Sequence, residues 1–306
     1  GNNNFATFYG SGSWADVNTN SPASNIANTS LLGVVSNGTN ATPYFNGTAL
    51  STKSSNMGGS APAGLLIGKY SGDSQYWDGL IAEIIIFNKN HSNTEREEVE
   101  GYLAHKWGLT TYLPSGHSSS TKFKTGTING TGQSLDLSNG VSAIVQTGGT
   151  EDVFDGGSAF STSLWIKGWP TSAGESIVSK DKFDPGAFGK LKAWLDASDA
   201  NYFSTGSGVP SAGDNFVKWY DLSGNNYHTS VESGTPSWES SLINSNPGAK
   251  LDGSTLVLDN SAVAFDEWSE LHVFAVLRIH ANTTWKRVFG KTSSVSSTAN
   301  TAWSYS

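Results

Sequence analysis

Short runs of β-branched and apolar residues, separated by turn residues, recur along most of this chain. Residues 31–35 form one such run, and residues 41–45 form another that leads directly into Asn46 and Gly47. Asn-Gly between two apolar runs is the strongest short-range signal for a β-hairpin. Residues 81–87 are almost continuously apolar, which predicts a central strand covered on both faces. The pattern therefore predicts a protein built mainly from β-strands.

One segment has the pattern of an α-helix instead. Thr94 and Glu97 have the spacing of a capping box, and glutamates fill the first turn, where the helix dipole favours negative charge. Apolar residues then recur at four-residue spacing as far as Trp107. We expect one short helix at about residues 94–107.

The composition narrows the classes of protein. Only 14% of residues are charged, against roughly 25% in an average soluble protein, and Gly, Ser, Thr and Asn take their place. This mixture suits strands joined by many turns and is typical of extracytoplasmic proteins. The net charge of -8, with scattered basic residues, argues against nucleic-acid binding. No run approaches the ~18 apolar residues that a membrane-spanning helix needs, so membrane insertion is not expected.

The absence of cysteine excludes a disulfide scaffold, a thiolate zinc site and a cysteine nucleophile. The chain also contains a diverged internal repeat. Residues 154–158 and 251–254 share an Asp-Gly motif, and each motif is followed by a strand pattern and a similar ending. Residues 115–130 are rich in Ser, Thr and Gly and have the composition of a linker.

Several stretches resemble a known family. Residues 77–88 (WDGLIAEIIIFN) and 101–109 (GYLAHKWGL) resemble the closing segment of laminin-G-like jelly-roll domains of the concanavalin A-like lectin/glucanase superfamily, in a form common in large bacterial surface and secreted proteins. Residues 191–199 (LKAWLDASD) are similar to the opening half of such a domain, and residues 133–180 look like an opening portion of a related one. The resemblance implies an all-β fold of concanavalin A-like jelly-roll β-sandwiches with one short α-helix.

The resemblance also implies an unusual order of segments. Residues 1–114 correspond to a closing half, 115–183 to a linker and an opening portion, and 184–306 to the opening half of a further, incomplete domain. A half-sandwich exposes an apolar sheet face and unpaired edges, which favours some pairing between segments. The chain is either a window across tandem modules, or residues 1–114 pair with residues 130–182 in a permuted sandwich.

Glycoside hydrolysis is the enzymatic alternative within that superfamily. Retaining hydrolysis needs two carboxyl groups about 5–5.5 Å apart. Hydrolase relatives place them on one strand as Glu-x-Asp-x-x-Glu, and this string is absent here. Glu151 and Asp152, like Asp266 and Glu267, are adjacent and would point to opposite faces of a strand. We predict no catalytic residues and no enzymatic activity.

A calcium site is the alternative considered for residues 221–226 (DLSGNN), where oxygen ligands alternate. The loop lacks the spaced carboxylates and the terminal Glu of an EF-hand. The favoured interpretation is a turn in which Asp221 bonds its own backbone. We therefore predict no metal site and no cofactor, with calcium kept as the alternative.

Tryptophans provide the candidate binding residues, because a flat indole ring can stack on a sugar. Trp169, Trp238 and Trp285 lie in turn-like surroundings and are the candidate ligand-binding residues, although for each of them a packing role is favoured over stacking on a sugar. The predicted function is a non-catalytic extracellular recognition module whose partner is a glycan or a cell-surface protein, as in adhesion. The alternative is a structural spacer repeated within a long adhesin or fibre, and a glycoside hydrolase is third.

Overall fold

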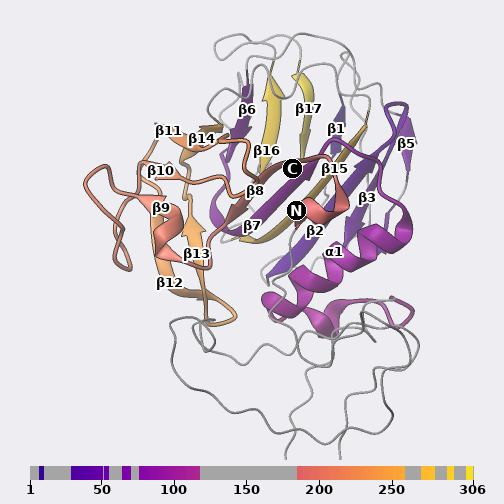
Figure 1. Ribbon diagram of the computed structural model, residues 1–306, viewed down its shortest axis with the longest axis horizontal. Coiled ribbons are helices and arrows are strands. Elements are labelled where there is room, and N and C mark those ends of the chain that lie inside the picture. Colours follow the sequence, from indigo (N-terminus) through magenta and orange to yellow (C-terminus); the bar gives the residue numbers. More distant parts are fainter. Residues whose placement is uncertain are drawn as a thin grey trace, which may run out of the picture. The chain divides into compact units, whose positions relative to one another are not determined.

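The computed structural model describes residues 7–9, 29–50, 52–54, 64–69, 76–117, 185–258, 270–279, 288–292 and 301–305. All of them belong to one compact unit, which excludes residues 121–184. The described residues form antiparallel β-sheets with a single α-helix (Figure 1). This confirms the predicted all-β class and is consistent with a jelly roll. No described helix is long and apolar enough to cross a lipid bilayer.

The larger sheet has nine strands and is centred on β7. Its hydrogen-bonded order is β12-β13-β7-β15-β2-β3-β4, and in addition β8 pairs with β7 and β5 pairs with β3. All nine residues of β7 are buried, as predicted for a central strand. The strands are β2 (Ser30–Ser36), β3 (Asn40–Phe45), β4 (Thr48–Ala49), β5 (Lys53–Ser54), β7 (Gly79–Phe87), β8 (Leu191–Asp196), β12 (Ser237–Ile243), β13 (Asn246–Lys250) and β15 (Leu271–Ile279).

The smaller sheet has six strands in the order β1-β17-β16-β6-β14-β11, and β10 and β9 form a separate two-stranded ribbon. Three 3-10 helices lie among the described loops. These elements are β1 (Thr7–Tyr9), β6 (Gly64–Ile67), η1 (Thr110–Tyr112), η2 (Pro185–Phe188), η3 (Ala200–Tyr202), β9 (Phe203–Ser204), β10 (Lys218–Trp219), β11 (Thr229–Ser233), β14 (Thr255–Leu258), β16 (Phe289–Thr292) and β17 (Thr301–Tyr305).

The two larger sheets share one hydrophobic core. Ile84 and Val273 of the nine-stranded sheet belong to the same buried cluster as Ile67, Leu256 and Phe289 of the six-stranded sheet. A common core between two antiparallel sheets is the arrangement of a β-sandwich.

The capping box of helix α1 (Asn93–Lys106) lies two residues before the predicted one. Ser92, not Thr94, is the N-cap: its Oγ accepts from the Glu95 N–H, and the Glu95 carboxylate accepts from the Ser92 N–H at 2.9 Å. Both hydroxyl residues precede a glutamate by three positions, so the pattern alone allowed either box. The apolar stripe that ends at Trp107 is buried, as predicted.

Strand pairing joins the first and last parts of the chain. From residues 1–114, β7 pairs with β8, β13 and β15, β2 pairs with β15, and β6 pairs with β14 and β16. The sequence-based division treated 1–114 and 184–306 as separate domains, whereas here both segments lie in the same two sheets. Residues 1–114 and residues 184–306 therefore supply neighbouring strands of the same sheets. Residues 118–183 lie outside the described residues, and their expected pairing with residues 1–114 stays a prediction.

Candidate functional site

Trp238 was predicted to bind ligand, but it is a packing residue. It lies on β12, is only 8% exposed and belongs to the hydrophobic core. Its Nε1 donates a hydrogen bond to the carbonyl oxygen of Ala197 at 3.0 Å. A ring buried in this way has no open face for a sugar. Trp169 and Trp285 lie outside the described residues, so their ligand binding remains a prediction.

The loop that was considered for calcium is held by its own hydrogen bonds. One carboxylate oxygen of Asp221 accepts from the backbone N–H groups of Trp194 and Ser223, both at 2.9 Å. The other accepts from the Ser223 hydroxyl at 2.7 Å and from the Tyr227 N–H at 3.0 Å. Asp221 thus bonds the backbone of its own loop, as the turn interpretation predicted, and it also fastens the loop to β8. Within the described part of the chain, no group of three or more His, Asp or Glu side chains is placed to hold a metal ion.

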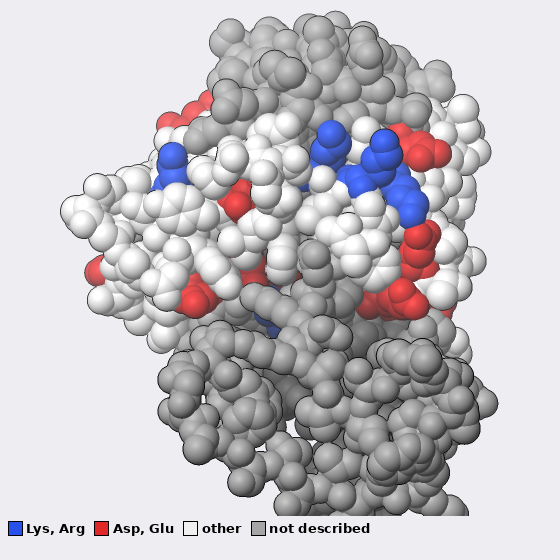
Figure 2. All heavy atoms as spheres, in the orientation of Figure 1, with Lys and Arg blue, Asp and Glu red and all other residues white. Residues whose placement is uncertain are grey.

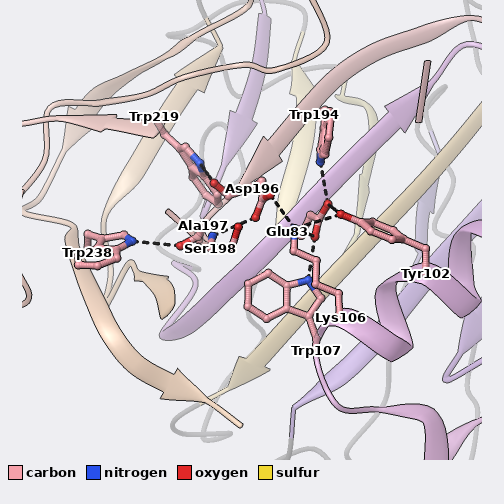
Figure 3. A network of polar contacts seen from close by, with 10 residues as sticks. All are labelled: Glu83, Tyr102, Lys106, Trp107, Trp194, Asp196, Ala197, Ser198, Trp219 and Trp238. Atoms are coloured by element: carbon pink, nitrogen blue, oxygen red, sulfur yellow. Dashed lines mark hydrogen bonds and ion pairs between the residues drawn. The ribbon is translucent and has the colours of Figure 1, made fainter. Parts of the chain in front are cut away.

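A buried polar network around Glu83 is the most unusual feature of the described core (Figure 3). Glu83 lies in the middle of β7 and is 0% exposed. One of its carboxylate oxygens accepts from Trp194 Nε1 at 2.7 Å, and the other accepts from Trp107 Nε1 at 2.8 Å. The Tyr102 hydroxyl also donates to it, at 3.3 Å. Side chains from helix α1 and from strand β8 therefore both bind the carboxylate of Glu83 on β7.

Lys106, at the end of α1, lies between two carboxylates. Its Nζ is 2.6 Å from Asp196 Oδ2 and 3.0 Å from Glu83 Oε2, and it donates to the Tyr102 hydroxyl at 3.0 Å. Asp196 stands at the end of β8 and is 2% exposed. Its second oxygen accepts from the Ser198 N–H at 2.9 Å, which closes a tight turn behind the strand.

The ends of β8 and β12 are tied to the same network. Trp219 Nε1 donates to the backbone carbonyl of Asp196 at 3.0 Å, next to the bond from Trp238 to Ala197 (Figure 3). Asp196 is therefore held through its backbone as well as through its side chain. Such fixed groups lose little further freedom when they interact.

Burial and mutual charge set the protonation of this network. Burial raises the pKa of Glu83, and the neighbouring Asp196 raises it further against the opposing effect of Lys106. For Lys106, burial alone would lower the pKa, but the Glu83, Tyr102 and Asp196 oxygens outweigh it and hold the pKa well above its ordinary value. Lys106 is thus a buried ammonium group shared by two carboxylates.

The sequence pattern does not indicate this network. The one visible signal was Glu83, a lone acid inside the apolar run of residues 81–87. A charged residue in a central strand needs a buried partner, because an unpaired charge there is too costly. Its bonded partners are separated from it by up to 111 residues in sequence, and no local pattern indicates them.

A second buried cluster fastens residues 113–117 to the helix. Arg96 pairs with Glu100 at 2.5 Å, and Glu100 also contacts His117 Nε2 at 2.9 Å. The Arg96 guanidinium lies 4.1 Å from the centre of the Tyr44 ring, which adds a cation–π contact to β3. These contacts are internal, and they anchor α1 on the edge of the larger sheet.

Two histidines form a third buried contact. The Nδ1 atoms of His91 and His272 are 2.8 Å apart, so one ring donates to the other. Burial lowers the pKa of His91 to about 4, with the Lys89 charge adding to this and Glu95 opposing it. Burial also lowers the pKa of His272 well below its ordinary value, helped by the His91 and Arg96 charges. Both rings are therefore neutral near pH 7.

We expect this pair to make folding sensitive to mild acid. In the unfolded chain both histidines take up a proton near pH 6.5, whereas the folded state resists protonation. The stability they contribute is complete above that pH and falls as the pH drops toward 4. Urea unfolding at pH 7.5 and pH 5 measures the loss. His91→Gln should reduce it, and an equal loss in the variant and the parent would contradict the assignment.

The carboxylates of the Glu83 network are unsuited to polysaccharide hydrolysis. Glu83 and Asp196 are the acids brought together around Lys106, and both are closed off from solvent. A glycosidase acid and nucleophile must flank the scissile bond of a bound sugar. The arrangement of these described residues supports a structural role or chemistry within the chain itself.

Comparison with known proteins gives one match. Residues 1–95 match a laminin G-like family model described as the concanavalin A-like lectin/glucanases superfamily. The match confirms the resemblance seen in the closing segment. No curated protein and no solved structure matches the chain.

Proposed function

From the concanavalin A-like, laminin G-like identity of residues 1–95, we propose that the protein is a non-catalytic extracellular recognition module. Its partner is a glycan or a cell-surface protein, as in adhesion. The family match is the observation that carries this proposal, since that superfamily fits carbohydrate-binding and adhesion-type modules. Because one fold can carry many functions, the side chains and the surface must also be consistent with this function.

The described carboxylates favour binding over hydrolysis. Glu83 and Asp196 lie inside the sandwich, where indole, ammonium and backbone donors occupy their oxygens. A further buried acid, Glu100, contacts Arg96 and His117. These buried acids stabilise the fold, and a recognition function does not need them to react with a substrate.

The character of the surface supports a neutral, hydrogen-bonding partner. On the face drawn in Figure 2, charged side chains are sparse among the described residues, and large areas between them carry neither sign. The whole chain has a net charge of -8 and only 14% charged residues. Hydroxyl and amide groups suit a glycan, whereas a polyanion such as nucleic acid would need a basic patch.

A spacer in a longer adhesin or fibre is the second candidate, and one observation favours it. Among described residues, the large apolar side chains that are exposed are Tyr112, Val209 and Val217, and the only aromatic ring of the three is that of Tyr112, at 44%. Tyr112 is thus the one strongly exposed aromatic ring among the described residues, and the predicted stacking residues Trp169 and Trp285 lie outside them. A chain that exposes no aromatic ring able to stack on a sugar would instead act as a spacer between other domains.

A glycan array probed with the full chain separates the two functions. We expect binding to a defined set of glycans, with a change of tryptophan fluorescence on titration. Trp169→Ala or Trp285→Ala should weaken binding at least about tenfold, or about 1.4 kcal/mol. Trp238→Phe is the matched control, because its buried ring should not affect affinity. Silence across the array, with unchanged fluorescence, would refute glycan recognition and favour the spacer.

A further inference from the structure

The Lys106–Asp196 contact places an amine and a carboxyl group, the two groups that form an amide, next to each other. Nζ and Oδ2 are 2.6 Å apart, and the two residues are separated by 90 positions in sequence. Lys106 ends the helix and Asp196 ends β8, so the contact connects the first and last parts of the chain (Figure 3). We propose that Lys106 and Asp196 become joined by an intramolecular amide bond that the folded chain forms by itself, with Glu83 as the proton acceptor.

The surroundings favour an amide over the ion pair. The side chain of Lys106 is 13% exposed, that of Asp196 is 2% exposed, and the indole of Trp107 lies 5.2 Å from Nζ. Two charges kept in such a site suffer a large loss of hydration, and attraction between them only partly compensates it. Condensation to a neutral amide removes both charges. The remaining exposure at Lys106 leaves a path for the released water.

Proximity supplies the rate that the reaction lacks in solution. Well-oriented groups inside one molecule react as though present at about 10⁵–10⁸ M. Asp196 is held by its side chain and its backbone, and Lys106 is held by three oxygen acceptors. Both reacting groups are therefore fixed before any chemistry begins.

The two carboxylates have different environments, which determines their roles. The Oδ1 atom of Asp196 accepts from the Ser198 N–H, a donor placed to stabilise negative charge on that oxygen when the carbon is attacked. Both carboxylate oxygens of Glu83 accept a hydrogen bond from an indole N–H, Oε2 from Trp107 and Oε1 from Trp194. Oε2 also lies 3.0 Å from Nζ of Lys106. Asp196 thus supplies the acyl carbon that the Lys106 amine attacks, and Glu83 receives and returns a proton.

The step balances without any other reactant. The ammonium form dominates at rest, so the amine arises when one proton moves along the hydrogen bond from Nζ to Oδ2. The nitrogen lone pair then attacks Cγ of Asp196, and the carbonyl electron pair moves to Oδ1. Glu83 takes a proton from the attacking nitrogen and passes it to the Oδ2 hydroxyl. The C–O bond breaks, one water leaves, the carbonyl re-forms, and Glu83 ends in its starting state.

Intact-mass spectrometry of the full chain tests the proposal. The folded and then denatured protein should be lighter than its sequence mass by one water, about 18 Da. Tryptic digestion should yield a branched peptide that joins Lys106 to Asp196. Lys106→Arg keeps the positive charge but lacks a reactive amine and should have its full sequence mass. Glu83→Gln should leave most of the chain unreacted.

Two controls make the result specific. The Lys89–Glu95 pair is equally close, at 2.5 Å, but its side chains are 31% and 32% exposed, and no cross-link should form there. Loss of water can also come from a cyclic imide at an Asp-Gly sequence such as Asp78-Gly79, which hydroxylamine cleaves and a true cross-link resists. A folded parent chain at full mass, with trypsin cutting normally after Lys106, would overturn the proposal. So would a water loss that maps to an imide.

Discussion

Replacing Glu83 by alanine is expected to lower the free energy of unfolding by about 3–5 kcal/mol. The substitution leaves the Lys106 ammonium with one carboxylate in place of two, and it takes the acceptor from the buried Trp107 and Trp194 N–H groups. Each buried donor left without a partner adds about 1–3 kcal/mol. Urea unfolding at pH 7.5 measures the loss.

The reference for this measurement must lack the cross-link. We therefore compare Glu83→Ala with its parent in the Lys106→Arg background, where a cation remains but no amide can form. Lys250→Ala is the surface control: Lys250 Nζ pairs with Asp252 at 2.9 Å and both side chains are exposed, so about 0.2–1 kcal/mol is expected. A loss at Glu83 no larger than the loss at Lys250 would show that the network does not stabilise the fold.

The features predicted correctly from the sequence are those that local residues determine. Asn46 and Gly47 both have positive φ, of 47° and 76°, and they connect β3 to β4 with Phe45 opposite Thr48. The continuous apolar run predicted β7, because a strand covered on both faces has no polar alternation. The helix was predicted to within a turn at each end.

The features missed depend on contacts between distant residues. The neighbours of Trp238 in sequence are turn-like, but strand pairing with β13 carries its ring into the core. The partners of Glu83 come from three separate elements, and each partner residue alone has an ordinary local role, such as a lysine in the last helical turn. Only the register of the strands brings them together.

The joining of residues 1–114 to residues 184–306 can be tested at one glycine. Gly68 follows β6 with φ of +84°, and a Cβ there would lie 2.5 Å from the carbonyl oxygen of Ser254. Its N–H donates to the Val288 carbonyl at 2.7 Å, so the backbone cannot shift freely. For Gly68→Ala, left-handed strain of about 1–2 kcal/mol adds to about 1–3 kcal/mol of overpacking. The expected loss in unfolding free energy is about 2–5 kcal/mol.

Gly224 is the matched control, because it has the same φ of +84° but no atom within 4 Å of the added Cβ. Gly224→Ala should therefore show the strain alone, about 1–2 kcal/mol. The difference between the two variants isolates the contact with Ser254, which exists only if β6 and β14 lie side by side. Equal losses in urea unfolding would mean that this contact is absent in the folded chain. The first and last segments would then fold as separate units, as the tandem-module alternative requires.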